Sequence, residues 1–127
     1  MYPPGYIVKG SSQPPRGGSP AMQTATVAEL KSALDSGRAT VLDVREPYEF
    51  DAGHIPGAIN IPMATVPVRL TELPAGGELH VVCESGARSW QVCAFLDRHG
   101  VSATNVEGGT GVWRMNGLPL EAGVPTR

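Results

Sequence analysis

The residues best suited to covalent chemistry lie in one short stretch that begins at Cys83. An apolar, strand-like run ends at Cys83, and a helical pattern starts about four residues later. A junction of this kind points successive backbone N–H groups into the bend, and the helix adds the positive end of its dipole. A cysteine beside such a cradle is expected to have a lowered pKa and to exist partly as the nucleophilic thiolate.

Two neighbours of Cys83 strengthen this interpretation. Gly86 allows a backbone conformation that residues with a Cβ avoid, and Arg88 supplies a fixed cation with a fork suited to oxyanions. Together they would hold a thiosulfate-like anion while Cys83 attacks its outer sulfur, a step related to thiol–disulfide exchange. The alternative is that Cys83 is a small apolar residue buried at a strand end, as free cysteines often are.

The other cysteine and the histidines give weaker signals. With two cysteines and three histidines at no ligand spacing, the chain predicts neither a disulfide framework nor a metal site, and no cofactor is expected. Cys93 lies on the predicted helix with Trp90 and Leu96 at core spacing, so we expect a buried thiol, a resolving cysteine being the alternative. His54 is interpreted as a hydrogen-bonding residue in a turn, with a general base as the alternative.

The elements that position Cys83 are short strands alternating with helices. A capping box at Thr26 and Glu29 predicts a helix that ends at Gly37, and its apolar face carries Val27, Leu30 and Leu34. Strands are predicted over 39–42, 57–62, 79–82 and 103–106, and further helices over 87–99 and around 112–113. The alternation predicts an α/β fold whose central parallel sheet has helices on both faces, with sites at the carboxyl ends of the strands. Asp43 and Cys83 both lie at such ends.

Length and composition limit the functions to consider. The 127 residues suffice for one domain, and a net charge of −2 provides no basic field for nucleic acid or an anionic membrane. No apolar run reaches about 18 residues, and the N-terminus lacks a leader pattern, so we expect a cytoplasmic protein. A monomer is expected as well, because an exposed site on a small domain is compatible with one. Residues 1–22 are rich in Pro, Gly and Ser and are expected to form a flexible arm, followed by a domain over 23–122 and a tail over 123–127.

Three segments of the chain resemble signatures of the rhodanese-like domain family. They occur in the family's order and are residues 43–50 with 53–58 and 60–62, residues 83–89, and residues 107–109 with 113 and 117–119. The resemblance implies a rhodanese-like α/β fold. It also implies a sulfurtransferase that moves sulfane sulfur from a donor such as thiosulfate to cyanide or a thiol through a persulfide on Cys83. Thioredoxin or a sulfur-carrier protein is an expected partner.

The same resemblance assigns the residues of the site. Cys83 matches the sulfur carrier, and the positions that match the persulfide-binding loop are Glu84, Ser85, Gly86, Ala87 and Arg88. Asp43 and Arg45 match supporting positions. We expect these two to form a buried ion pair, although Asp43 could serve only to end its strand. Trp113 is expected either at the rim of the site or as a core anchor.

The length and charge of the loop refine the expected chemistry. Four residues separate Cys83 from Arg88, one fewer than in related cell-cycle phosphatases, which favours sulfur over phosphatase or arsenate reductase chemistry. Glu84 departs from a loop suited to anions, because its carboxylate opposes thiolate formation and repels thiosulfate unless an arginine pairs with it. This predicts weak use of thiosulfate and a preference for persulfide donors. The alternative function is a rhodanese-fold binding or regulatory module, against which the intact Cys83 argues.

Overall fold

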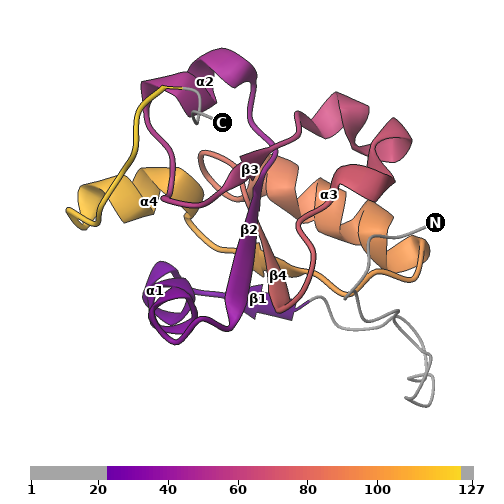
Figure 1. The fold of residues 1–127 in the computed structure, drawn as a ribbon, viewed down its shortest axis with the longest axis horizontal. Coiled ribbons are helices and arrows are strands. Elements are labelled where there is room, and N and C mark those ends of the chain that lie inside the picture. The colour runs from indigo at the N-terminus through magenta and orange to yellow at the C-terminus, as the bar shows by residue number, and fades with distance from the viewer. Residues whose placement is uncertain (1–22, 124–127) are drawn as a thin grey trace.

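A five-stranded parallel sheet forms the centre of the computed structural model, which describes residues 23–123 (Figure 1). The strand order is β1-β5-β4-β2-β3. The elements in chain order are β1 (Gln23–Ala25), α1 (Val27–Asp35), β2 (Ala39–Asp43), α2 (Pro47–Ala52), β3 (Ile59–Asn60), the 3-10 helices η1 (Met63–Val68) and η2 (Leu70–Glu72), β4 (Glu78–Val82), α3 (Ala87–Arg98), β5 (Thr104–Val106) and α4 (Gly109–Met115). The expected arm over 1–22 and nearly all of the expected tail lie outside the described residues.

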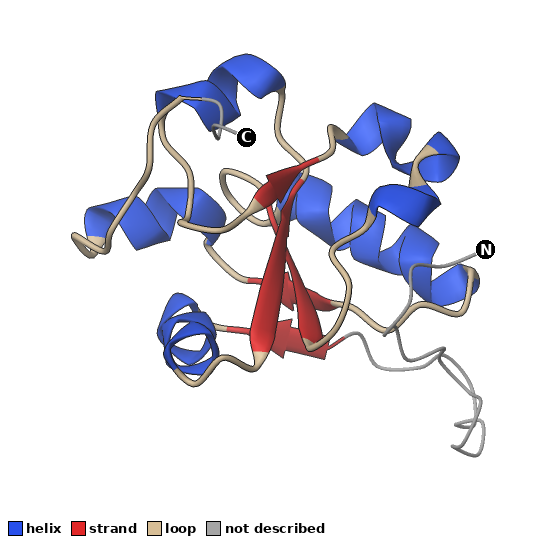
Figure 2. Ribbon diagram, viewed as in Figure 1, coloured by secondary structure: helices blue, strands red, loops and turns tan. Residues whose placement is uncertain are grey.

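Two hydrophobic clusters cover the two faces of the sheet. Successive residues of a strand point to opposite faces, so Val81 of β4 joins one cluster and Val82 joins the other. The first cluster packs against α3 and η1, and the second packs against α1, α2 and α4. Figure 2 shows the helices on both sides of the strands. The predicted α/β fold with a covered parallel sheet is therefore confirmed.

The first helix begins as its capping box predicts. The Thr26 hydroxyl accepts the Glu29 amide at 3.0 Å, and the Thr26 amide donates to the Glu29 carboxylate at 2.8 Å. These bonds satisfy amides that a helix start otherwise leaves without partners. Val27 and Leu30 are buried as expected, and Ala33 is buried where Leu34 was predicted.

The structure corrects several predicted elements. The strand predicted over 57–62 is only Ile59–Asn60, because Gly57 forms a turn with φ of +85° and Pro62 caps η1. Strand β1, helix α2 and both 3-10 helices were not predicted. Trp90 is 45% exposed rather than in the core. The buried stripe of α3 instead consists of residues at helical spacing, namely Ser89, Val92, Cys93 and Leu96.

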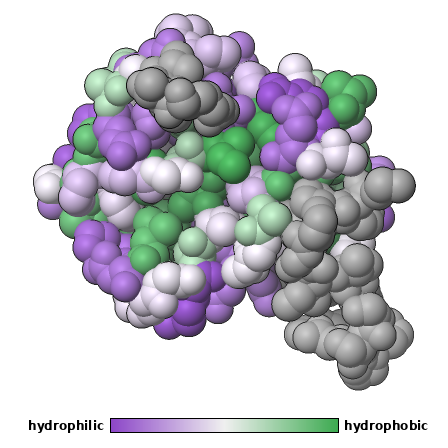
Figure 3. Space-filling view, viewed as in Figure 1, coloured by the Kyte–Doolittle hydropathy of each residue, from purple (hydrophilic) through white to green (hydrophobic). Residues whose placement is uncertain are grey.

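The surface carries apolar as well as polar side chains. In Figure 3 hydrophobic and hydrophilic residues are interspersed on the face in view. Among residues 23–123, the most exposed large apolar side chains are those of Tyr48, Val68 and Met115, at 75%, 85% and 83%. Among the helices of residues 23–123, none combines the length and apolar character needed to cross a bilayer.

Candidate active site around Cys83

The loop that carries Cys83 lies at the carboxyl edge of the sheet. Cys83 directly follows β4, whose last residue pairs in register with Asp43 at the end of β2. Helix α3 begins four residues after Cys83, and its N-cap is Gly86 with φ of +108°. This φ lies in a region that favours glycine, so Gly86 allows the chain to turn tightly from strand into helix.

The sulfur of Cys83 is fully buried and surrounded by hydrogen-bond donors. The Gly86 amide donates to Sγ at 3.0 Å, and the Ser89 hydroxyl lies 3.4 Å from Sγ. Burial by itself raises the pKa of Cys83. A hydrogen bond with the Ser89 hydroxyl, together with the amides of Ser89, Gly86 and Ser85, outweighs the effect of burial, so the pKa of Cys83 lies below its ordinary value. The arrangement favours a thiolate, as the sequence predicts.

A buried network of hydrogen bonds, the buried polar chain, runs from the Cys83 sulfur to β5. The Ser89 hydroxyl donates to Oδ1 of Asn105 at 2.5 Å, and Nδ2 of Asn105 donates to the Gly86 carbonyl at 3.3 Å. Ser89 is 0% exposed and Asn105 is 4% exposed. Neither was predicted as a site residue. Ser89 lies at the end of the segment 83–89 that resembles the family's loop, so the sequence did carry a signal for it, whereas Asn105 was marked only by being a polar residue within a predicted strand.

Asp43 and Arg45 form the buried ion pair that was expected. The Nη2 atom of Arg45 lies 2.8 Å from Oδ2 of Asp43, and Nε lies within 3.1 Å of both carboxylate oxygens. Arg45 Nη2 also donates to the Gly53 carbonyl at 2.9 Å. Two buried charges are thus paired and hydrogen-bonded, which is the condition for tolerating them in a core.

Two arginines hold the carboxylate of Glu84. Its Oε1 lies 3.2 Å from Nη1 of Arg45, and its Oε2 lies 2.7 Å from Nη1 of Arg114 on α4. The side chain of Glu84 is 41% exposed. The expected repulsion between Glu84 and an anionic sulfur is therefore offset by two cations, the exception that the sequence analysis allowed for.

Arg88 is held by a partner that the sequence analysis did not anticipate. Its Nη1 and Nη2 atoms donate to the two carboxylate oxygens of Glu49 at 2.8 and 3.0 Å. The hydrogen bond from Arg88 lowers the pKa of Glu49 to about 2, against an opposing effect of burial. The guanidinium group of Arg88, which was expected to bind an oxyanion, instead connects the start of α3 to α2.

The start of α4 closes over the loop with its backbone. The Thr110 amide donates to the Cys83 carbonyl at 2.9 Å, and the Gly111 amide donates to the Glu84 carbonyl at the same distance. A Cβ on Gly109 would collide with the Cys83 carbonyl oxygen, and φ at Gly109 is +55°. These glycines are required because two backbone segments approach each other closely.

Trp113 does not lie at the rim of the site, contrary to one of the two expectations. It is 1% exposed and belongs to the cluster beneath α1 and α4, and its Nε1 donates to the Pro119 carbonyl at 2.7 Å. The rim prediction is therefore wrong, and Trp113 is the core anchor of the alternative. The preceding loop approaches Cys83 through its backbone, whereas the indole packs inward.

His54 and Cys93 are both buried away from solvent. His54 Nδ1 lies 2.8 Å from the Phe50 carbonyl, and its ring stacks on Phe50 at 3.6 Å between centroids, which fits the structural role. Burial raises the pKa of Cys93 to about 12, with a smaller contribution from Cys83. A thiol so weakly ionised is a poor nucleophile, so the geometry favours the buried-thiol interpretation of Cys93 over the resolving one.

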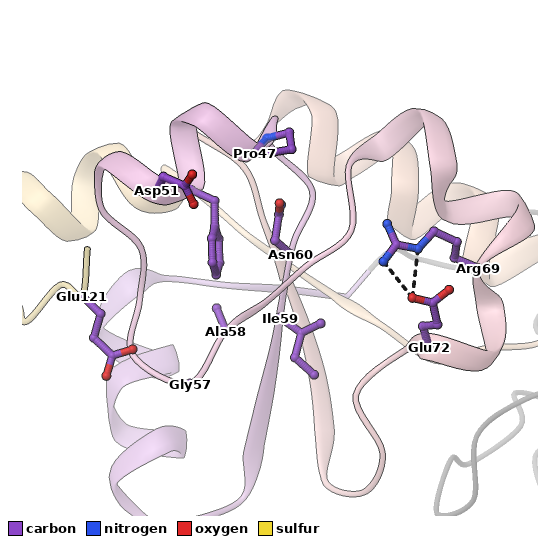
Figure 4. Close-up of a pocket in the computed structure, with 10 residues that line it drawn as sticks. Pro47, Asp51, Gly57, Ala58, Ile59, Asn60, Arg69, Glu72 and Glu121 are labelled. Atoms are coloured by element: carbon purple, nitrogen blue, oxygen red, sulfur yellow. Dashed lines mark hydrogen bonds and ion pairs between the residues drawn. The ribbon is translucent and has the colours of Figure 1, made fainter. Parts of the chain in front are cut away.

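A separate pocket of about 710 Å³ lies beside the outer strand β3 (Figure 4). Helix α2, strand β3 and the 3-10 helix η2 contribute to its walls, and the ion pair of Glu72 with Arg69, the N-cap of η2, forms one side. None of residues 83–88 lines it. The pocket shares α2 with the candidate site around Cys83, since Phe50 and Asp51 line the pocket while Glu49 binds Arg88.

The fold and site define a class of α/β proteins that present a cysteine in a cradle of amides between a parallel strand and a helix. Residues 26–116 match the rhodanese-like domain, and the chain belongs to this family. A sulfurtransferase of Allochromatium vinosum is 38% identical over 89 residues, covering 69% of this chain and 83% of the relative. A putative sulfur carrier protein of Bacillus subtilis is 36% identical over 72 residues, 56% of this chain and 39% of that protein. The rhodanese-like domain protein of Staphylococcus aureus superposes with a TM-score of 0.72 at 37% identity, covering 81% of this chain and 100% of that structure.

Proposed function

We propose that this chain transfers sulfane sulfur from a donor to a thiophilic acceptor through a persulfide on Cys83. The observation that carries the proposal is the Cys83 sulfur, which lies 3.0 Å from the Gly86 amide at the start of α3. Fixed amides and a helix N-terminus stabilise negative charge on sulfur both before and after the transfer. The membership of the chain in a family with sulfurtransferases supports the same reaction.

The reaction consists of two displacements at sulfur. The Cys83 thiolate attacks the outer sulfur of the donor, a new S–S bond forms, and the old bond to that sulfur breaks with its electron pair on the leaving group. With thiosulfate the leaving group is sulfite, and with a persulfide it is a thiolate. In the second step cyanide or an acceptor thiolate attacks the outer sulfur, so that thiocyanate or a new persulfide leaves and the Cys83 thiolate returns.

The charges around the loop favour persulfide donors over thiosulfate. The three nearby arginines are each paired with a carboxylate, Arg45 with Asp43, Arg88 with Glu49 and Arg114 with Glu84. A dianion therefore meets amides and neutralised pairs instead of free guanidinium groups. Persulfide donors such as glutathione persulfide or a sulfur-carrier protein, and thiol acceptors such as thioredoxin, match this environment better.

Intact mass spectrometry tests the proposal. The wild type, Cys83→Ser and the matched thiol variant Cys93→Ala are incubated briefly with thiosulfate or with glutathione persulfide, and then with cyanide. We expect the mass of one sulfur atom to be added to the wild type and to Cys93→Ala but not to Cys83→Ser, and cyanide to remove it. If neither donor adds sulfur, the enzymatic proposal fails and a rhodanese-fold binding module becomes the better account.

A further inference from the structure

The hydroxyl of Ser89 has one hydrogen and two neighbours that can accept it. One is Oδ1 of Asn105 at 2.5 Å, and the other is Sγ of Cys83 at 3.4 Å. The amide of Asn105 is oriented by its other end, because Nδ2 donates to the Gly86 carbonyl. Since Oδ1 has no hydrogen to give, the short contact with Ser89 requires the hydrogen of the hydroxyl.

This single hydrogen distinguishes the two ionisation states of Cys83. While Ser89 donates to Asn105, its oxygen accepts from the S–H of a neutral thiol. A thiolate has no S–H, so it gains from Ser89 only when the hydroxyl turns toward the sulfur. That rotation leaves Oδ1 of Asn105 buried without its donor, which opposes ionisation.

We propose that Asn105 is a positioning residue that controls the ionisation of Cys83 by competing with the sulfur for the Ser89 hydrogen. The inference rests on the proposed function in one respect, namely that the thiolate is the attacking form. Asn105 then opposes the ionisation that the amides of the loop favour, and the hydroxyl turns to the sulfur when charge develops there. The buried polar chain therefore has a role in reactivity as well as in packing.

The charged and titratable groups around Cys83 do not account for this effect. Arg88 and Cys93 on α3 both interact electrostatically with Cys83. Arg88 is bound by Glu49 of α2, and Glu84 of the loop is bound by Arg114 of α4 and by Arg45, which also pairs with Asp43 of β2. None of these groups touches Ser89 or Asn105 through a hydrogen bond among the described residues. Substitutions at 89 and 105 therefore leave these charge pairs unchanged.

A double-mutant cycle tests the proposal through the thiolate itself. Asn105→Leu removes the competing acceptor with little change in shape, and we expect about tenfold more thiolate at pH values below the pKa of Cys83. Ser89→Ala is expected to lower the thiolate fraction. The double variant should behave as Ser89→Ala, because Asn105 acts through the hydroxyl. The probe is ultraviolet thiolate absorbance against pH, with the spectrum of Cys83→Ser subtracted.

Several outcomes would overturn the inference. An unchanged or reduced thiolate fraction in Asn105→Leu would do so, as would an equal effect of that substitution when Ser89 is absent. If Asn105→Leu does not fold, Asn105→Asp decides, since it keeps an acceptor, adds negative charge and must lower the thiolate fraction. The readout needs no sulfur donor, so a wild type that titrates as expected but never gains sulfur refutes the proposed function alone.

Discussion

The bidentate pair of Glu49 with Arg88 makes the stability of the domain depend on pH in a defined way. The pKa of Glu49 falls from 4.5 to about 2 on folding, because Arg88 binds the charged form. At about 1.4 kcal/mol for each pH unit, the ionised carboxylate stabilises the fold by up to about 3 kcal/mol at neutral pH. Glu49→Gln should lower the free energy of unfolding by this amount. Glutamine can still serve in the capping box, so the charge is what changes.

The pH window of this effect follows from the direction of the shift. A carboxyl whose pKa is lower in the folded state contributes its full stabilisation above the unfolded value of 4.5 and loses it as the pH falls through about 2. At pH 3 only about 1 kcal/mol of the difference between wild type and Glu49→Gln should remain. Urea unfolding followed by circular dichroism, at several values from pH 7 to pH 3, measures the difference directly.

Glu72→Gln is the matched control for this prediction. Glu72 also pairs with an arginine, at 2.7 Å, but its side chain is 52% exposed. Solvent screens an exposed pair, so Glu72→Gln should change the free energy of unfolding much less than Glu49→Gln does. The reasoning is refuted if Glu49→Gln costs no more than Glu72→Gln at pH 7, or if its cost is the same at pH 3.

Three further predictions concern backbone contact, buried charge and the core. Gly109→Ala should destabilise the domain by more than about 2 kcal/mol and slow sulfur uptake. Gly117→Ala is the control, because open space surrounds its Cβ position at φ of +71°, and it should cost only about 1 kcal/mol. Equal decreases of the melting temperature in the two variants would contradict this prediction. Arg45→Met leaves the Asp43 carboxylate buried without a cation and should lower the free energy of unfolding in urea by about 3–5 kcal/mol. A decrease below about 1 kcal/mol would show that other hydrogen-bond donors suffice for Asp43. Trp113→Phe removes volume and a hydrogen bond and should lower the free energy of unfolding by about 2 kcal/mol, with sulfur uptake by the folded protein unchanged. Slower uptake would indicate that Trp113 contributes to the candidate site.

Local signals predicted the parts of the structure that depend on local physics. The capping box at Thr26, the strand that ends before Cys83 and the conformation required at Gly86 are set by nearby residues. Each was therefore visible in the sequence. The pair of Asp43 and Arg45 was also predictable, since its members are two residues apart and share one turn of the chain.

The partners that complete the site are distant in sequence, which explains why they were missed. Arg88 and Glu49 are 39 residues apart, and Ser89 and Asn105 are 16 apart. Nothing in the pattern of one segment specifies which charge of another segment it meets. The exposure of Trp90 shows the same limit, because the orientation of α3 is set by what it packs against.

The pairing of β1 with β5 has a consequence for how the domain is made. Gln23 lies opposite Thr104, so the first and last strands of the described residues are neighbours although 81 residues separate them. A chain synthesised from its N-terminus extends past Cys83 before β5 and α4 exist, and pairings of such long range form late in folding. Asn105 and the Thr110 amide therefore reach the nascent cysteine last. The sulfur transfer proposed for Cys83 would then be available only to a finished domain, and a chain truncated before β5 would carry the cysteine without Asn105 and the Thr110 amide.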